Sequence, residues 1–136
     1  MAQQIQIEES KKVLIIEDNK DLQEILKLNF ESESIEVLQA FDGLNWLIEM
    51  LSKKPDVVLL DLMMPRLDWF ELLEILSLRK EIQVPVIICS NIKAEDYKNK
   101  KTSSRGDMFI EKADHSGSEI VEKVLEFLNK NSKNNL

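Results

Sequence analysis

The chain has 136 residues, the usual size of one domain, and with 43% hydrophobic and 32% charged residues it is too apolar to be disordered. Its 25 acidic and 18 basic residues give a net charge of −7, which disfavours direct binding to nucleic acid. The glycines Gly43, Gly106 and Gly117 are too far apart to form a glycine-rich nucleotide-binding loop.

Cysteine content and the chain ends indicate the compartment and the domain limits. The single cysteine, Cys89, cannot form an internal disulfide, and the polar first residues do not resemble a signal peptide. No apolar run approaches the roughly 18 residues that span a bilayer. We therefore expect a cytoplasmic protein without membrane insertion, with a folded domain at 11–131 and flexible segments at 1–10 and 132–136.

Short apolar runs alternate along the chain with segments of helical periodicity. The first half predicts a strand at 13–16, a helix with Leu22, Ile25, Leu26 and Phe30 on one face, a strand at 35–38, a helix with Leu44, Leu47, Ile48 and Leu51, and a strand at 57–60. The second half predicts a helix with Trp69, Leu72, Leu73 and Leu76, strands at 84–89 and 108–110, and a last helix with Ile120, Val121, Val124, Leu125 and Leu128.

Two helix starts and one weak helix stand out in this series. Ser116 and Glu119 have the spacing of a capping box, and Asp68 is placed to cap the helix that begins at Trp69. Residues 93–105 carry five basic and two acidic residues but almost no apolar stripe. We expect a short, loosely held or partner-dependent fourth helix there.

The alternation predicts a doubly wound α/β fold with a five-stranded parallel sheet and five helices. Sites in such sheets lie at the carboxyl ends of the strands. The residues at those ends are Glu17, Asp18, Asp61, Ser90 and Lys112. Three clustered acids need a counter-charge, which Mg²⁺ and a lysine supply. Asp61 is then placed to accept a phosphoryl group, whose oxygens Lys112 and Ser90 would contact.

Five ordered blocks of this sequence resemble the receiver domains of two-component response regulators, which have a flavodoxin-like fold. The resemblance runs from about residue 12 to 129. The blocks are Val13-Leu-Ile-Ile-Glu-Asp-Asn19, Ala40-Phe-Asp-Gly43, Asp56-Val-Val-Leu-Leu-Asp-Leu-Met-Met-Pro-Arg-Leu-Asp68, Pro85-Val-Ile-Ile-Cys-Ser90 and Phe109-Ile-Glu-Lys112.

The resemblance implies a phosphoacceptor at Asp61, assisted by Lys112 and Ser90. It also implies an Mg²⁺ site, open to Mn²⁺ as well, formed by Glu17, Asp18, Asp61 and the backbone carbonyl of Met63. Ser90 and Phe109 match the family's switch residues. The implied partners are a histidine kinase or phosphotransfer protein, and downstream a protein partner or a second receiver copy. The only implied catalysis is the domain's own phosphorylation and dephosphorylation.

Four positions depart from the family pattern. Ala113 stands where proline usually follows the lysine, so that peptide is either trans or held cis at a cost of about 3 to 4 kcal/mol. Asn91 replaces a small residue beside the phosphoryl pocket, and Trp69 and Arg105 replace glycines. We expect Cys89 to be an inert buried thiol and His115 to be a solvated surface residue.

Two other functions remain open from the sequence. One is a receiver-like docking or dimerisation module that is not phosphorylated, which the departures at Asn91 and Ala113 favour. The other is a metal-dependent phosphatase, which is weaker because Met63 occupies the position where such enzymes carry a second acid. The length fits either a stand-alone regulator or a fragment of a larger protein.

Overall fold

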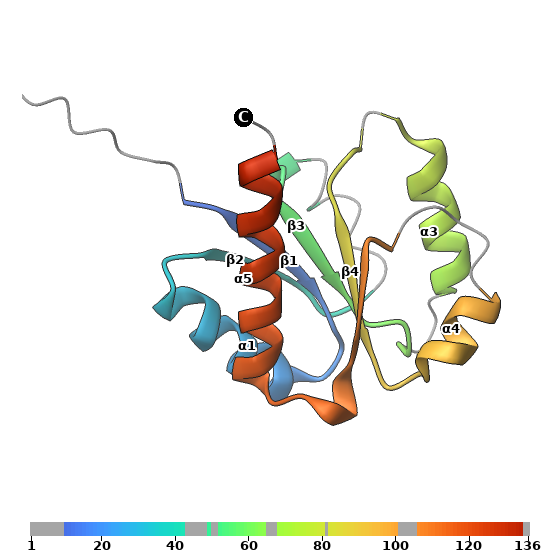
Figure 1. The fold of residues 1–136 in the computed structure, drawn as a ribbon, viewed down its shortest axis with the longest axis horizontal. Helices are drawn as coiled ribbons and strands as arrows, with labels where there is room; N and C mark the ends of the chain where they lie inside the picture. Colours follow the sequence, from blue (N-terminus) through green and yellow to red (C-terminus); the bar gives the residue numbers. More distant parts are fainter. Residues whose placement is uncertain are drawn as a thin grey trace, which may run out of the picture.

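One parallel sheet organises the computed structural model, which describes residues 10–42, 49, 52–64, 68–80, 82–100 and 106–134 (Figure 1). Its five strands lie in the order β2-β1-β3-β4-β5. They are β1 (Lys12–Ile16), β2 (Glu36–Ala40), β3 (Val57–Leu60), β4 (Val86–Ser90) and β5 (Met108–Glu111). The predicted doubly wound α/β fold is therefore confirmed.

The helices cover both faces of the sheet (Figure 1). They are α1 (Lys20–Ser32), α3 (Trp69–Leu78), α4 (Ala94–Lys100) and α5 (Gly117–Asn134), with a 3₁₀ turn, η1, at Lys112–Asp114. The described residues thus contain four α-helices and not the five that we predicted. The remaining prediction rested on Leu44, Leu47, Ile48 and Leu51, which lie outside the described residues.

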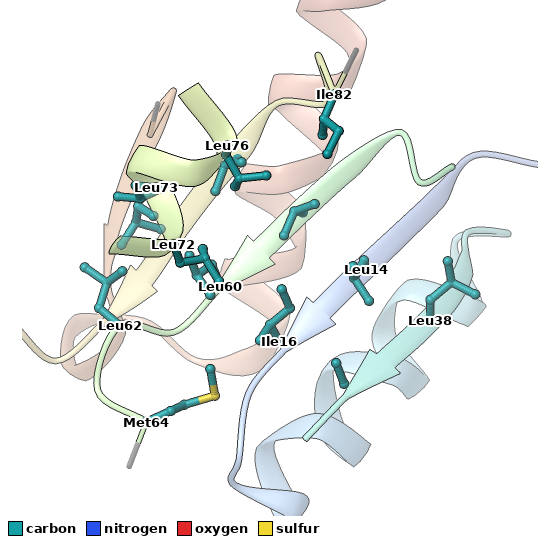
Figure 2. Close-up of a cluster of buried hydrophobic side chains, with 14 of the residues drawn as sticks. Leu14, Ile16, Leu38, Leu60, Leu62, Met64, Leu72, Leu73, Leu76 and Ile82 are labelled. Atoms are coloured by element: carbon teal, nitrogen blue, oxygen red, sulfur yellow. The ribbon is translucent and has the colours of Figure 1, made fainter. Parts of the chain in front are cut away.

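Alternate residues of β1 belong to two separate hydrophobic clusters, because successive side chains of a strand point to opposite faces of the sheet. Val13 and Ile15 pack with residues of α1 and α5. Leu14 and Ile16 pack on the other face with residues of α3, as Figure 2 shows. β1, β3 and β4 are therefore almost wholly apolar, as expected for strands covered on both sides.

The buried face of α1 differs from the predicted one. Its buried residues are Gln23, Leu26 and Phe30, whereas Ile25 is 47% exposed. Ile25 lies at the seam with α5, where its Cγ2 occupies the space that a Cβ at Gly117 would need. The glycine at the start of α5 thus allows α1 and α5 to pack closely.

The hydropathy of the helices and the extent of the described chain bear on two further expectations. None of the described helices is long and apolar enough to cross a membrane. The boundaries of the flexible ends stay a prediction, because residues 1–9 and 135–136 lie outside the described part and α5 runs to Asn134.

The predicted capping box at the start of α5 is confirmed. The backbone N–H of Glu119 donates to Ser116 Oγ at 3.2 Å, and the backbone N–H of Ser116 donates to Glu119 Oε1 at 3.0 Å. These backbone and side-chain bonds with Ser116 lower the pKa of Glu119. Two free amides of the first helical turn are satisfied in this way.

Replacing the capping serine should destabilise the domain. We expect Ser116→Ala to lower the free energy of unfolding by about 1 kcal/mol, since it removes the side-chain acceptor. Ser77→Ala is the matched control, because the Ser77 hydroxyl donates to the carbonyl of Glu74 within its own helix and caps no free amide, and its effect should stay within about 0.5 kcal/mol. Urea denaturation followed by circular dichroism measures both, and equal losses would contradict the capping role.

Candidate functional site

The carboxyl edge of the sheet brings together the polar residues that we predicted there. Glu17 follows β1, Asp61 follows β3, Ser90 ends β4, and Lys112 directly follows β5. Glu17, Asp61 and Ser90 are buried, whereas Asp18 is exposed. Carboxylate oxygens of Glu17, Asp18 and Asp61 all lie within 4.8 Å of one another.

Lys112 is the counter-charge of the two buried acids. Its Nζ forms an ion pair with Glu17 Oε1 and lies 3.2 Å from Asp61 Oδ2. The side chain of Lys112 is only 18% exposed, so water screens these pairs weakly. One ammonium thus bridges acids that follow two different strands.

The burial of these charges perturbs their protonation. Desolvation raises the pKa of Glu17 to about 7, against the opposing hydrogen bond from Lys112. Desolvation also disfavours the charged form of Lys112, but its hydrogen bond to Glu17 and the negative charges of Asp61 and Glu17 outweigh this and raise its pKa. The ammonium therefore stays protonated, while burial favours the neutral form of the Glu17 carboxyl.

The chemistry of the donor set fits a hard divalent cation. Three carboxylates against one ammonium leave excess negative charge, and oxygen ligands are those that Mg²⁺ prefers. The exposure of Asp18 leaves one side of the cluster open to solvent, which suits an ion that retains several waters. Glu17, Asp18 and Asp61 are the residues that would hold it.

The second oxygen of Asp61 is held by the backbone. The N–H of Met63 donates to Asp61 Oδ1 at 3.1 Å, so both oxygens of this carboxylate have partners. The Met63 side chain is 62% exposed and points away from the core. That the Met63 carbonyl binds the metal stays a prediction.

The switch residues that the resemblance implied lie on neighbouring strands. Ser90 is fully buried, and its Oγ accepts the backbone N–H of Ile92 at 3.4 Å. Phe109 stacks on Tyr97 of α4, with ring centroids 4.9 Å apart and an interplanar angle of 21°. An aromatic contact thus connects β5 with α4, beside the strand that ends at Ser90.

Several secondary expectations can now be compared with the structure. The described residues contain no cis peptide bond, so the bond before Ala113 is trans, within η1. Cys89 is buried, as predicted, and this burial raises its pKa to about 12, which disfavours the reactive thiolate. Asp68 caps α3 through the N–H of Glu71 at 3.3 Å, also as predicted.

His115 was predicted wrongly. It is half-buried, and its Nδ1 lies 2.7 Å from the carbonyl oxygen of Glu111 across the η1 turn. The tight turn brings the ring back onto the strand end, which the linear sequence does not reveal. Asn91 is exposed, while Arg105 and the side chain of Trp69 lie outside the described parts of the structure.

Two residues that support the site were missed from the sequence. Gln23 is buried beneath Glu17, and the Glu111 Oε1 atom accepts the N–H of Ala94 at 3.1 Å, at the start of α4. The sequence could have revealed Gln23, because it lies three residues before Leu26 and seven before Phe30 and so shares their buried face of the helix. No local pattern reveals the role of Glu111, since its partner Ala94 is 17 residues away in the sequence.

Comparison with known proteins defines the class of this chain as a receiver domain. The family model of the response regulator receiver domain matches residues 13–125, and the chain belongs to that family. Receiver domains are generally non-enzymatic modules of two-component signalling. They bind Mg²⁺ in an acidic pocket and interact with histidine kinases or phosphotransfer proteins.

Solved structures show the same fold. The chain is similar to the receiver domain of the Francisella response regulator 1452, with 30% identity and a TM-score of 0.71, over 90% of this chain and 99% of that one. A CheY-like receiver domain protein from Methanospirillum hungatei has 23% identity and a TM-score of 0.78, over 93% and 99%. The chemotaxis regulator CheY4 of Vibrio cholerae has 18% identity and a TM-score of 0.75, over 88% and 99%.

Removing the Lys112 ammonium should destabilise the domain, because the buried acids beside it would lose their counter-charge. We expect Lys112→Met to lower the free energy of unfolding by about 2 to 3 kcal/mol in chelator-containing buffer, because Glu17 and Asp61 lose their counter-charge. Lys53→Met is the control, since the Lys53 side chain in its pair with Glu49 is 53% exposed and its loss should matter by about 0.5 kcal/mol or less. Urea denaturation tests the difference, and similar values for both variants would refute it.

Proposed function

We propose that this receiver domain accepts a phosphoryl group on Asp61 in an Mg²⁺-dependent reaction and thereby changes its affinity for a partner. The observation that carries the proposal is the environment of Asp61. Asp61 is a buried carboxylate that follows a strand, and its Oδ2 lies 3.2 Å from Lys112 Nζ. Carboxylate oxygens of Glu17 and Asp18 lie within 4.8 Å of an Asp61 oxygen, close enough to share one metal ion with it.

The transfer reaction uses the carboxylate as a nucleophile. An oxygen of Asp61 attacks the phosphorus of a phosphohistidine, the P–N bond breaks, and the neutral imidazole leaves after it takes up a proton. The product is an acyl phosphate on Asp61. Bound Mg²⁺ would neutralise charge on the phosphoryl oxygens. Lys112 is already positioned at Asp61, and we propose that it and the Ser90 hydroxyl contact the transferred group.

The donor that this chemistry requires is a histidine kinase or a histidine phosphotransfer protein. The family supplies the support for this donor class, because receiver domains interact with such proteins. The recipient of the signal would be a downstream protein or a second receiver copy. A receiver-like module that docks without phosphorylation is the competing outcome, and the experiment below separates the two.

Intact mass spectrometry with a small phosphodonor tests the proposal. We expect wild type with Mg²⁺ to gain one phosphoryl group, and no detectable gain for Asp61→Ala, for Asp18→Ala, or for wild type in excess chelator. Asp21→Ala is the matched control, because Asp21 is an exposed acid in the first turn of α1 and should leave the reaction intact.

Each possible result has a distinct meaning. Phosphorylation of Asp61→Ala would exclude Asp61 as the acceptor, and full phosphorylation of Asp18→Ala would exclude the proposed metal site. A wild type that folds and binds partners but gains no phosphoryl group would favour the docking module.

The output segment of the proposed switch is α4. Of its seven residues, only Tyr97 is a large apolar residue, and that side chain is buried against Phe109. The N–H of Ala94 is capped by Glu111, which precedes Lys112. Ser90 accepts the N–H of Ile92, two residues before α4, so movement of Ser90 or Lys112 toward a phosphoryl group would act on the start of this helix.

Phosphorylation should change the stability of this segment selectively. We expect slower amide exchange in residues 92–100 of the phosphorylated domain, with little change in α1 between residues 22 and 30, because a weakly anchored helix responds to a few kcal/mol. Hydrogen exchange with mass spectrometry measures both regions. Unchanged exchange at 92–100 in a demonstrably phosphorylated sample would show that α4 is not the responding element.

A further inference from the structure

A buried amide on α1 lies beneath the turn that carries the acidic pair. Gln23 is only 1% exposed, and its Nε2 lies 3.1 Å from each of three carbonyl oxygens. These belong to Ile15 in β1, to Glu17 after β1, and to Ala40 at the end of β2. One side chain therefore joins the carboxyl ends of two neighbouring strands.

The orientation of this amide follows from its partners. Carbonyl oxygens only accept hydrogen bonds, so the NH₂ group of Gln23 must face them, with its two hydrogens shared among three acceptors. The amide oxygen on the other side accepts Gln39 Nε2 at 3.1 Å. Gln39 thus supports the same orientation from β2.

The Gln23 amide contacts the first residue of the Glu17–Asn19 turn, and the side chain of that residue in turn bonds the last. The Glu17 N–H donates to the Ala40 carbonyl at 3.0 Å, and this carbonyl is one of the acceptors of Gln23. At the other end, the Asn19 N–H donates to Glu17 Oε2 at 3.1 Å. The Glu17 carbonyl that Gln23 contacts belongs to the peptide leading to Asp18, so its position sets the direction of both acids.

We infer that Gln23 is a positioning residue for the acidic pair, holding the peptide between Glu17 and Asp18 so that both carboxylates converge with that of Asp61. This inference rests on the proposed function, since Mg²⁺ is the ligand that the pair is proposed to bind. Gln23 itself touches neither the ion nor the phosphoryl group. Groups that orient metal ligands in this way typically affect metal affinity about 10- to 100-fold.

The test uses the full chain and three variants. Gln23→Met keeps the length of the side chain and removes the amide, and Gln39→Met removes only the support for the amide oxygen. Leu26→Met is the matched control, because Leu26 is equally buried one turn further along α1 and lines the core. Calorimetric titration with MgCl₂ gives the affinity, and NMR-detected exchange of single amides gives the order of the turn.

We expect Gln23→Met to weaken Mg²⁺ binding about tenfold or more, Gln39→Met to weaken it less, and Leu26→Met to leave it unchanged. In metal-free buffer, Gln23→Met should also speed exchange of the Asn19 amide more than that of Val58, whose N–H bonds Pro85 in the sheet. A general loss of stability would speed exchange of the central-strand amide of Val58 at least as much as that of Asn19, so faster exchange at Asn19 alone isolates the local role.

The outcomes for the two hypotheses are distinguishable. If wild type binds Mg²⁺ and Gln23→Met binds it equally well, the positioning role is overturned and the proposed function stands. If wild type binds no Mg²⁺, the proposed metal site fails, and exchange at Asn19 then decides the role of Gln23 in the turn alone. Should Gln23→Met not fold, an unchanged affinity and Asn19 exchange in Gln39→Met would overturn the inference.

Discussion

The site depends on one electrostatic constraint, which is that two buried carboxylates share a single ammonium. Glu17 and Asp61 lie beside each other after adjacent strands, and Lys112 bridges them from the far side of the sheet. Leaving either carboxylate without this partner would be destabilising, because burying an unpaired charge is costly. The arrangement is held together yet incompletely neutralised, which is the condition under which a cation or a phosphoryl group alters the local balance most strongly.

The sheet creates this constraint through its register. β1 and β3 are neighbours in which Ile16 pairs with Leu60, so the residues that follow them emerge at the same level. β4 and β5 end together, with Ser90 opposite Glu111, and this places Lys112 at the same edge. The two hydrophobic clusters fix the strands from both faces. Packing energy from the core is thus what maintains an electrostatically unfavourable group of acids.

Around this rigid edge, the supporting contacts differ in strength. On the side of β2, Gln23 and Gln39 form a buried network with the strand ends, and such networks restrict the backbone. On the side of β5, α4 is held by the Tyr97–Phe109 stack and by the cap from Glu111. The contacts beside β2 are suited to keeping the acidic side chains fixed. The fewer contacts that hold α4 beside β5 are suited to a segment that moves when the charge of the site changes.

Local sequence patterns determined the strands, the parallel sheet, the acids at the strand ends and the capping box at Ser116, because each depends on periodicity or on neighbours within a few residues. Only the tertiary structure decided the rest. The spacing of apolar residues does not fix the rotation of α1 about its own axis to within one residue position. Packing in the folded domain buries Gln23 and leaves Ile25 exposed. The pairing of Lys112 with Glu17 joins residues 95 positions apart, and the half-buried setting of His115 depends on a tight turn. Contacts of this kind arise from packing in three dimensions, which no local pattern encodes.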